Sequence, residues 1–258
     1  MQQNAGAALP TKASLAIAAG FRARIARGDL RAGEPLPVES ELMDELGVSK
    51  GVVREALRIL ETEGLVEVRR GLGGGPRVRH PSISEAAQAI GVYLQIGDVP
   101  VTDVWATRDR IIGGAVERLA LRGAEADLGP VDAGVRALAA AVGDFDAYHP
   151  QLLDVGERTV LAAGSATEHV IVASLRHVIA AELEAATRAV VDVDHAVAVE
   201  ETVVRAWTEA LDHVRRHRPR AARRAYDRQA DIVRIGLWEM MKDATVGDVM
   251  ALPPGGED

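Results

Sequence analysis

Short polar and basic side chains gather at the start of one amphipathic stretch, SKGVVREAL. Ser49, Lys50 and Arg54 carry hydrogen-bond donors and positive charge of the kind that binds phosphate oxygens and the edges of bases. Helical spacing places Val53 and Leu57 on the opposite side of the same stretch. This arrangement is typical of a helix whose N-terminal end enters the major groove of DNA.

A glycine-tipped basic hairpin follows. Residues 65–70 alternate like a strand, GLGGG at residues 71–75 makes the tip, and RVR at residues 77–79 returns. The glycines let the protein backbone approach the sugar-phosphate backbone of DNA closely, while Arg69 and Arg77 add phosphate contacts that release counterions. A nucleotide phosphate loop is disfavoured, because GLGGG lacks a Lys-Ser/Thr pair and does not open a helix.

Two earlier helices must position the basic stretch. Apolar spacing predicts helices over residues 12–27 and 38–46, with Gly47 supplying the turn that follows. Ser49 is a good N-cap for the next helix because its hydroxyl can accept a hydrogen bond from an orphan amide. Gly64 is expected to end that helix in the left-handed conformation. Helices, turn and hairpin in this order predict a winged helix-turn-helix.

Charge is divided unevenly along the 258 residues, whose net charge is -8. Residues 1–80 carry 12 lysines and arginines against 10 acidic residues, whereas the remainder carries 18 against 28. This asymmetry assigns a DNA-facing surface to the N-terminal part. The arginines within residues 215–228 are interpreted as a solvated basic face paired with the acidic excess, and a second nucleic-acid surface is the alternative.

Cysteine is absent, which excludes disulfides, thiolate metal sites and cysteine nucleophiles and is consistent with a reducing cytosol. No apolar run approaches the roughly 20 residues of a membrane span. The start, MQQNAGAALP, lacks the basic and apolar regions of a signal peptide. We therefore expect a cytoplasmic protein without a membrane partner.

From residue 84 onward the apolar pattern is helical almost throughout, so we expect a mainly α protein whose C-terminal part is an antiparallel all-α helical bundle. The expected helices lie near residues 84–95, 101–122, 124–142, 148–163, 167–190, 194–217 and 219–241. The expected divisions are a disordered lead 1–10, the winged helix-turn-helix domain 11–79 with its small β-hairpin wing, a linker 80–83, the helical domain 84–242 and a tail 243–258.

Residues 36–79 resemble the GntR family of bacterial transcription regulators. The matching stretches are LPVESELM, LGVSKGVVREALRILETEGLV and RRGLGGGPRV, where the family reads roughly LPSERELA, LGVSRTTVREALRxLExxGLV and a glycine-rich wing. Residues 108–120 and 210–226 look like parts of the FCD-type effector domain of the FadR-like branch. The resemblance implies a non-enzymatic regulator, expected to be a repressor. It would be a homodimer on double-stranded DNA with a pseudo-palindromic operator, modulated by an effector in the helical domain.

The resemblance also implies which residues contact DNA, and two of these positions differ from the family's usual residues. Ser40 and Lys50 stand where the family usually has arginines, while Ser49 and Arg54 are kept. Serine cannot make a bidentate guanine contact and lysine is a point charge, so we expect an altered operator. Val38 replaces a capping serine. The alternative for Arg54 is a surface ion pair with Glu55 or with a neighbour of Arg58. The expected DNA-binding residues are Ser40, Ser49, Lys50, Gly51, Arg54, Arg69, Gly73, Gly74 and Arg77.

Many FadR-like domains bind a divalent metal through an aspartate and histidines. The resemblance places these positions at Leu152, Gly156, Trp207 and Gln229, none of which is a good ligand. We therefore expect no metal, no cofactor and a more apolar pocket for a lipid-like acid such as a fatty acyl-CoA. Arg108 is expected to bind the anionic head group. The expected effector-binding residues are Arg108, Leu152, Gly156, Trp207 and Gln229.

Several alternatives stay open. Trp207 could be plain core packing, and Arg108 could form a salt bridge with Glu117 or another carboxylate. Another register could build a metal site from Asp154 with His149 or His177, as in a metal-dependent sensor of small carboxylates. An effector-independent architectural DNA-binding protein and a metal-assisted hydrolase are the remaining alternatives. The hydrolase is disfavoured because no ligand constellation with a base is in register.

Overall fold

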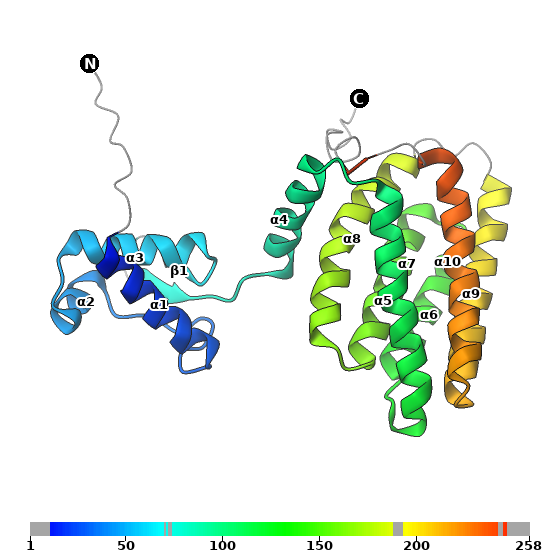
Figure 1. Ribbon diagram of the computed structural model, residues 1–258, viewed down its shortest axis with the longest axis horizontal. Coiled ribbons are helices and arrows are strands. Elements are labelled where there is room, and N and C mark those ends of the chain that lie inside the picture. Colours follow the sequence, from blue (N-terminus) through cyan, green and yellow to red (C-terminus); the bar gives the residue numbers. More distant parts are fainter. Residues whose placement is uncertain (1–10, 70, 72–73, 188–192, 242–244, 247–258) are drawn as a thin grey trace, which may run out of the picture. The chain divides into compact units, whose positions relative to one another are not determined.

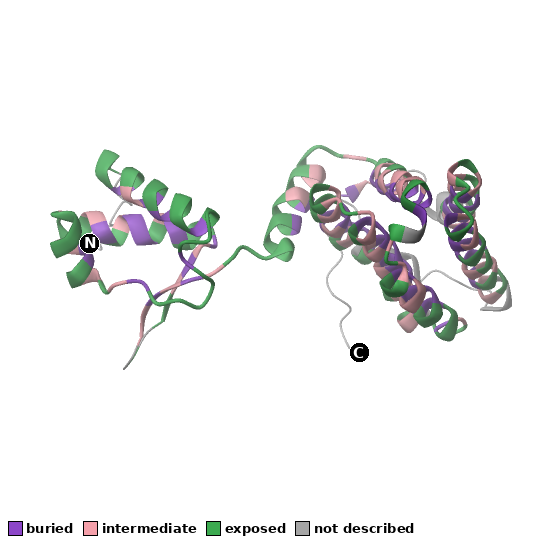
Figure 2. Ribbon diagram, turned by 90° about the horizontal axis from the view of Figure 1, so that it is seen from below, coloured by how far each residue is buried: buried purple, intermediate pink, exposed green. Residues whose placement is uncertain are grey.

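The computed structural model describes residues 11–69, 71, 74–187, 193–241 and 245–246. The chain divides into two compact units, the first ending at Ser82 and the second beginning at Ile83 (Figure 1). Buried positions in each unit lie along the helix faces that pack together (Figure 2). The expected lead, most of the expected tail and Gly73 lie outside the described residues.

The N-terminal unit contains three helices and one hairpin. Its elements are α1 (Lys12–Ala26), α2 (Glu39–Leu46), α3 (Lys50–Thr62), β1 (Val66–Arg69) and β2 (Gly75–Val78). The two strands are antiparallel, with Val66 opposite Val78 and Arg69 opposite Gly75. The apolar core includes Phe21 of α1 and Leu60 of α3, and it also takes in Val66 and Val78 from the hairpin. The core therefore fixes the position of α3 relative to the hairpin, as a winged helix-turn-helix requires.

The second unit is called here the helical unit, because its described residues form helices and their connections, apart from one isolated bridge. Its elements are α4 (Ile83–Ile96), α5 (Val101–Arg122), the 3-10 turn η1 (Gly123–Glu125), α6 (Gly129–Ala140), α7 (Phe145–Ala162), α8 (Ala166–Thr187), α9 (Val193–Arg215) and α10 (Pro219–Met241). Helix α5 contacts α7, α8, α9 and α10. Such a central helix must be apolar on most of its surface, and its buried residues include Trp105, Ile112 and Leu119.

The expected helix over residues 124–142 is wrong at its start. Residues Gly123–Glu125 form a 3-10 turn, and α6 begins only at Gly129. Pro130 lies in the first turn of α6, where its missing amide costs no hydrogen bond, and Asp127 accepts the amide of Gly129 at 3.0 Å. An N-terminal proline therefore marks a new helix here, which the apolar pattern alone does not reveal.

Two residues of the expected tail contribute to the helical unit. Val246 is buried beside Trp105 and Val178 in an apolar cluster, and its amide donates to the carbonyl of Val99 at 3.0 Å. Thr245 forms an isolated bridge with Pro100. In the described part of the chain, no helix combines the length and apolar character that a membrane span needs.

Candidate nucleic-acid interface and buried arginine site

The turn between α2 and α3 depends on a glycine. Gly47 has φ +64, in the left-handed region, and its amide donates to the carbonyl of Met43. Gly64 has φ +70 just beyond α3, and its amide donates to the carbonyl of Glu61 at 3.0 Å. The amide of Leu65 reaches the carbonyl of Leu60 at 2.9 Å, which completes a Schellman motif. The expected roles of both glycines are confirmed.

Ser49 occupies the N-cap position of α3, with φ -72 and ψ 156, but its hydroxyl makes no capping hydrogen bond. The prediction of a side-chain cap at Ser49 is therefore wrong. Its carbonyl, rather than its hydroxyl, accepts the first helical amides, from Val52 at 3.0 Å and Val53 at 3.2 Å. A hydroxyl that is not used as a cap is left able to bond to an external acceptor beside Lys50.

The start of α2 has no side-chain cap either, as expected from Val38. Glu41 compensates in part, because its carboxylate accepts the amide of Val38 at 3.1 Å. This is the reciprocal half of a capping box, in which the residue at N3 reaches back to the N-cap. The orphan amides of the first turn of α2 still lack the oxygen that a serine at position 38 would supply.

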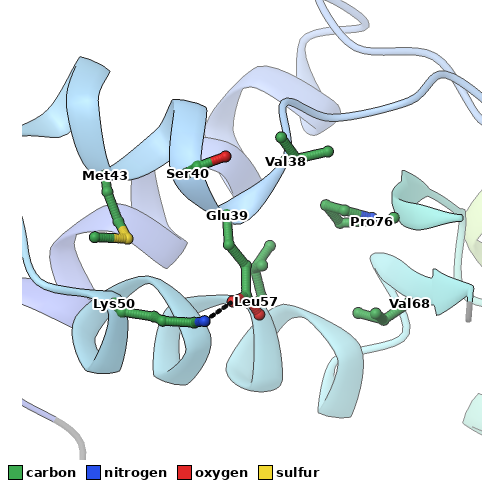
Figure 3. Close-up of a pocket in the computed structure, with 9 residues that line it drawn as sticks. Val38, Glu39, Ser40, Met43, Lys50, Leu57, Val68 and Pro76 are labelled. Atoms are coloured by element: carbon green, nitrogen blue, oxygen red, sulfur yellow. Dashed lines mark ion pairs between the residues drawn. The ribbon is translucent and has the colours of Figure 1, made fainter.

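Two cations of α3, Lys50 and Arg54, share one carboxylate, which comes from α2. Nε of Arg54 donates to both carboxylate oxygens of Glu39, at 3.0 Å each. Nζ of Lys50 lies 3.9 Å from Oε2 of Glu39 (Figure 3). The expected alternative for Arg54 was an ion pair with Glu55 or another neighbour. In the structure Glu55 pairs with Arg58 instead. Lys50 and Arg54 both remain more than half exposed, so their charge faces solvent.

A groove runs between α2, α3 and the hairpin, with a volume of about 520 Å³ (Figure 3). Its lining brings Ser40 and Lys50, two predicted DNA-binding residues, to one surface with Glu39. The other lining residues are Val38, Met43, Leu57, Val68, Gly75 and Pro76. Gly51 is exposed in the first turn of α3 and has no heavy atom closer than 4.0 Å to a Cβ built on it.

The hairpin carries the remaining predicted contacts. Arg69 is exposed and pairs with Glu67 at 2.6 Å, and Nη1 of Arg77 donates to the carbonyl of Gly33 at 3.1 Å. Gly74 must be glycine, because a Cβ there would lie 2.3 Å from the carbonyl oxygen of Arg69. The backbone at Gly74 therefore lies close to the end of β1.

In the helical unit the predicted effector residues are all buried. Arg108 of α5 is only 3% exposed, and its guanidinium lies 5.8 Å from the ring centroid of Trp105. Its Nη2 donates to the carbonyl of Leu153 at 3.3 Å, while Nε has no hydrogen-bond partner. A Cβ built on Gly156 would lie 2.6 Å from Nη2 of Arg108. The absent side chain at position 156 therefore makes the space that this guanidinium occupies.

A carboxylate and a phenol complete this buried cluster. Asp109 lies 3.7 Å from Nη1 of Arg108 and accepts a hydrogen bond from the hydroxyl of Tyr226 at 3.0 Å. Burial raises the pKa of the Asp109 carboxyl, although Arg108 and the Tyr226 hydrogen bond lower it. Burial also raises the pKa of Tyr226 well above that of an ordinary phenol, so the hydroxyl keeps its proton. The carboxylate near Arg108 is thus Asp109.

The other predicted effector residues belong to the apolar interior. Trp207 packs edge-on against Tyr226, with ring centroids 5.2 Å apart, and joins the same apolar cluster as Leu152. Its indole Nε1 is buried without a hydrogen-bond partner. Gln229 is a buried polar residue of α10. Core packing thus accounts for most of the surface of Trp207, and an effector role for these residues stays a prediction.

The alternative metal register can be compared with the described side chains. Asp154 receives a hydrogen bond from Arg158, its neighbour one turn along α7. Among the described residues, no group of three or more histidines and carboxylates converges as metal ligands do.

Many arginines near the α9–α10 turn pair with carboxylates, as the interpretation of a solvated basic face predicts. These ion pairs join Arg215 to Asp132 and Asp212, Arg216 to Asp212, Arg223 to Asp227 and Arg228 to Glu209.

A sequence family matches part of the N-terminal unit, whereas a solved structure matches most of the chain in fold. The model of the bacterial regulatory proteins of the gntR family matches residues 13–74. The Exu regulon transcriptional regulator of Escherichia coli K12 is 49% identical over 57 residues, which are 22% of each chain. The putative L-lactate dehydrogenase operon regulatory protein of the same strain is 44% identical over 77 residues, or 30% of each chain. The match therefore spans less than a third of these relatives' length.

The likeness in fold extends further. A solved Streptococcus agalactiae GntR structure superposes with a TM-score of 0.63, covering 86% of this chain and 99% of that one, at 20% sequence identity. It supports the combination of a helix-turn-helix with a helical domain, and at this identity it shows the fold alone. The family model, the regulators with similar sequence and the geometry of α2, α3 and the hairpin agree: residues 13–74 form a helix-turn-helix domain of the GntR family.

Proposed function

We propose that the protein is a DNA-binding transcription regulator that reads a duplex with α3 and the β1–β2 hairpin. The observation that carries this proposal is the exposed N-terminal end of α3, where Ser49, Lys50 and Arg54 lie within a GntR-family domain. A helix presented in this way can insert its first turns into a major groove, with the hairpin against the neighbouring backbone. Relatives of similar sequence over part of their length are transcriptional regulators of the exu regulon and the uxu operon, which supports the same function.

We expect two copies to act together on a pseudo-palindromic operator. One α3 and one hairpin contact only a short half-site, and a two-fold dimer doubles the contact and fixes the half-site spacing. Repression is the expected sign of regulation, because a bound dimer obstructs other proteins on the same duplex.

The test compares two arginines of α3. A duplex is first selected from a random library by the wild-type protein, and fluorescence anisotropy then measures its affinity for the Arg54→Ala and Arg58→Ala variants. A bidentate base contact is worth about 1–3 kcal/mol, so Arg54→Ala should weaken binding roughly fivefold to more than a hundredfold. Arg58, which pairs with Glu55 further along α3, is the matched control and should matter much less. Equal losses in the two variants would contradict the proposed orientation of α3.

We further propose that the helical unit binds an anionic, lipid-like effector at Arg108, for example a fatty acid or its acyl-CoA thioester. A buried guanidinium with an unpartnered Nε supports this, because a buried donor without a partner is costly and an anion would satisfy it. The apolar surroundings from Trp105 and Leu152 suit a hydrocarbon chain. Effector binding would shift the dimer between geometries that fit or do not fit the operator.

A thermal-shift panel tests the effector proposal. Acyl-CoA thioesters of increasing chain length, free fatty acids and small carboxylates are added to the purified protein with and without chelator. A ligand at 100 times its Kd stabilises by about 2.7 kcal/mol, which is a shift of a few degrees. We expect long acyl compounds to stabilise regardless of chelator. Stabilisation by small acids only when metal is present would instead support a metal-dependent carboxylate sensor.

A further inference from the structure

One acidic side chain lies at the centre of the candidate nucleic-acid interface. Glu39 belongs to the first turn of α2, yet its carboxylate contacts two cations of α3, Lys50 and Arg54 (Figure 3 draws the ion pair with Lys50). An acid so close to the expected path of a phosphate backbone opposes DNA binding by simple charge repulsion. The position of Glu39 therefore indicates a role other than raising the affinity for DNA.

The bond to Glu39 restrains Arg54 in a particular way. Nε is held by both carboxylate oxygens at 3.0 Å, while the Arg54 side chain stays 62% exposed. The carboxylate bonds described for Arg54 thus use Nε alone, and the two Nη groups keep their four donors. A planar guanidinium fixed along one edge presents its other donors in a defined direction, as a bidentate guanine contact requires.

The same carboxylate competes with phosphate. Non-specific DNA binding comes from lysine and arginine contacts to the backbone and needs no defined geometry. A phosphate that takes Lys50 must draw the ammonium away from Glu39, and a phosphate that accepts from the Nη groups of Arg54 is an anion held close to the Glu39 carboxylate. In either case the phosphate gains less than it would from a free cation. A guanine that accepts from the Nη groups leaves the Nε bond in place. The carboxylate thus penalises one mode of contact more than the other.

We propose that Glu39 is a specificity-determining residue, which lowers binding to random DNA and orients Arg54 for a base. The proposal rests on the proposed function of the domain. Among the described ion pairs of the N-terminal unit, Glu39 is the carboxylate that joins two cations of α3 to a different helix. Glu55 offers a matched control, because it pairs with Arg58 within α3 and contacts one cation.

The experiment measures the affinity of full-length Glu39→Gln and Glu55→Gln for two duplexes over a range of salt concentrations. One duplex is selected from a random library by the wild-type protein, and the other contains the same bases in scrambled order. Both variants lose one negative charge, so general electrostatics changes equally. We expect Glu39→Gln to bind the scrambled duplex about tenfold more tightly, with a salt slope steeper by about 0.9–1.8, as for one or two added phosphate contacts. Its selectivity should fall by about tenfold, and that of Glu55→Gln by less than about twofold.

A double variant shows whether Glu39 acts through Arg54. In an Arg54→Ala background, Glu39→Gln should change selectivity much less than it does alone, because the residue to be oriented is missing. Glu39→Asp keeps the charge at the start of α2 but shortens its reach, and it should also lose selectivity, so the test survives a folding defect in Glu39→Gln. Equal selectivity in Glu39→Gln and Glu55→Gln would overturn the inference and leave the proposed function intact. Failure of the wild type to enrich any duplex would refute the proposed function itself.

Discussion

Replacement of Tyr226 by phenylalanine removes a single hydroxyl from the interior of the helical unit. That hydroxyl is the donor to Asp109 at 3.0 Å, and Tyr226 is 1% exposed. The ring and its edge-on contact with Trp207 are retained, so no large cavity opens. The change therefore isolates one buried hydrogen bond to a carboxyl group next to Arg108.

The magnitude follows from the charge of the acceptor. A hydrogen bond to an ionised group contributes about 1.5–3 kcal/mol, more than a bond between neutral groups, because the charge is left poorly solvated when the donor goes. In Tyr226→Phe the Asp109 carboxylate keeps Arg108, at 3.7 Å, as its nearest cation. We expect the free energy of unfolding at pH 7.5 to fall by about 1.5–3 kcal/mol.

The cost should depend on pH, with a definite sign. Burial raises the folded-state pKa of Asp109 above its ordinary value, so the folded protein holds that proton more tightly than the unfolded chain does. Stability linked to Asp109 is therefore greatest when the group is protonated, and it falls as pH rises from the ordinary carboxyl range through the folded pKa. The Tyr226 hydrogen bond lowers that pKa, and its loss raises it further. Tyr226→Phe should thus cost more at pH 7.5 than at pH 4.5.

Urea unfolding followed by tryptophan fluorescence measures this difference in the right part of the chain, because Trp105, Trp207 and Trp238 all belong to the helical unit. Tyr93→Phe is the control, since Tyr93 is 79% exposed and the loss of its hydroxyl should change stability by less than about 0.5 kcal/mol. A Tyr226→Phe variant as stable as the wild type, or one whose cost is the same at both pH values, would refute the conclusion that the Tyr226 hydrogen bond lowers the pKa of Asp109.

Two further substitutions test packing and capping. Gly156→Ala should destabilise the helical unit by about 1–3 kcal/mol in the same urea assay, because the new Cβ lies 2.6 Å from both Arg108 and Ile112. Unchanged stability would mean that the guanidinium moves aside freely. Val38→Ser should stabilise the N-terminal unit by about 1 kcal/mol by supplying the missing N-cap oxygen of α2, as thermal unfolding by circular dichroism would record. An unchanged Tm would mean that Glu41 already satisfies this helix start.

Local signals predicted the helix-turn-helix domain well because they act over a few residues. The predicted ends of α1 and α3 lie within one residue of the observed ends, and Gly47 and Gly64 marked turns that need a positive φ. The absence of a side-chain N-cap at Val38 could also be predicted, since valine has no hydrogen-bond acceptor in its side chain. None of these inferences needed to know which distant segments touch.

Side-chain partners could not be predicted in the same way. Arg54 pairs with Glu39, which is 15 residues away, rather than with its neighbour Glu55. Helical spacing identifies residues on one helix that can meet, but the approach of α2 to α3 is set by core packing and by the Gly47 turn. The hydroxyl of Ser49 illustrates a related limit, because an N-cap position fixes the backbone and leaves the side-chain rotamer free.

At Gly156 the structure differs from what the residue type alone predicts. An absent side chain in a pocket-lining position suggested open space, whereas the structure fills that space with the guanidinium of Arg108. Gly156 and Arg108 depend on each other. A longer residue at position 156 would displace the guanidinium, and without the guanidinium a glycine at 156 would leave a void in a packed interior. An acidic effector at this position would meet a guanidinium already held by Leu153 and near Asp109, with Nε as its unpartnered donor. Its affinity would therefore depend on the charge of Asp109, which competes with the ligand for Arg108.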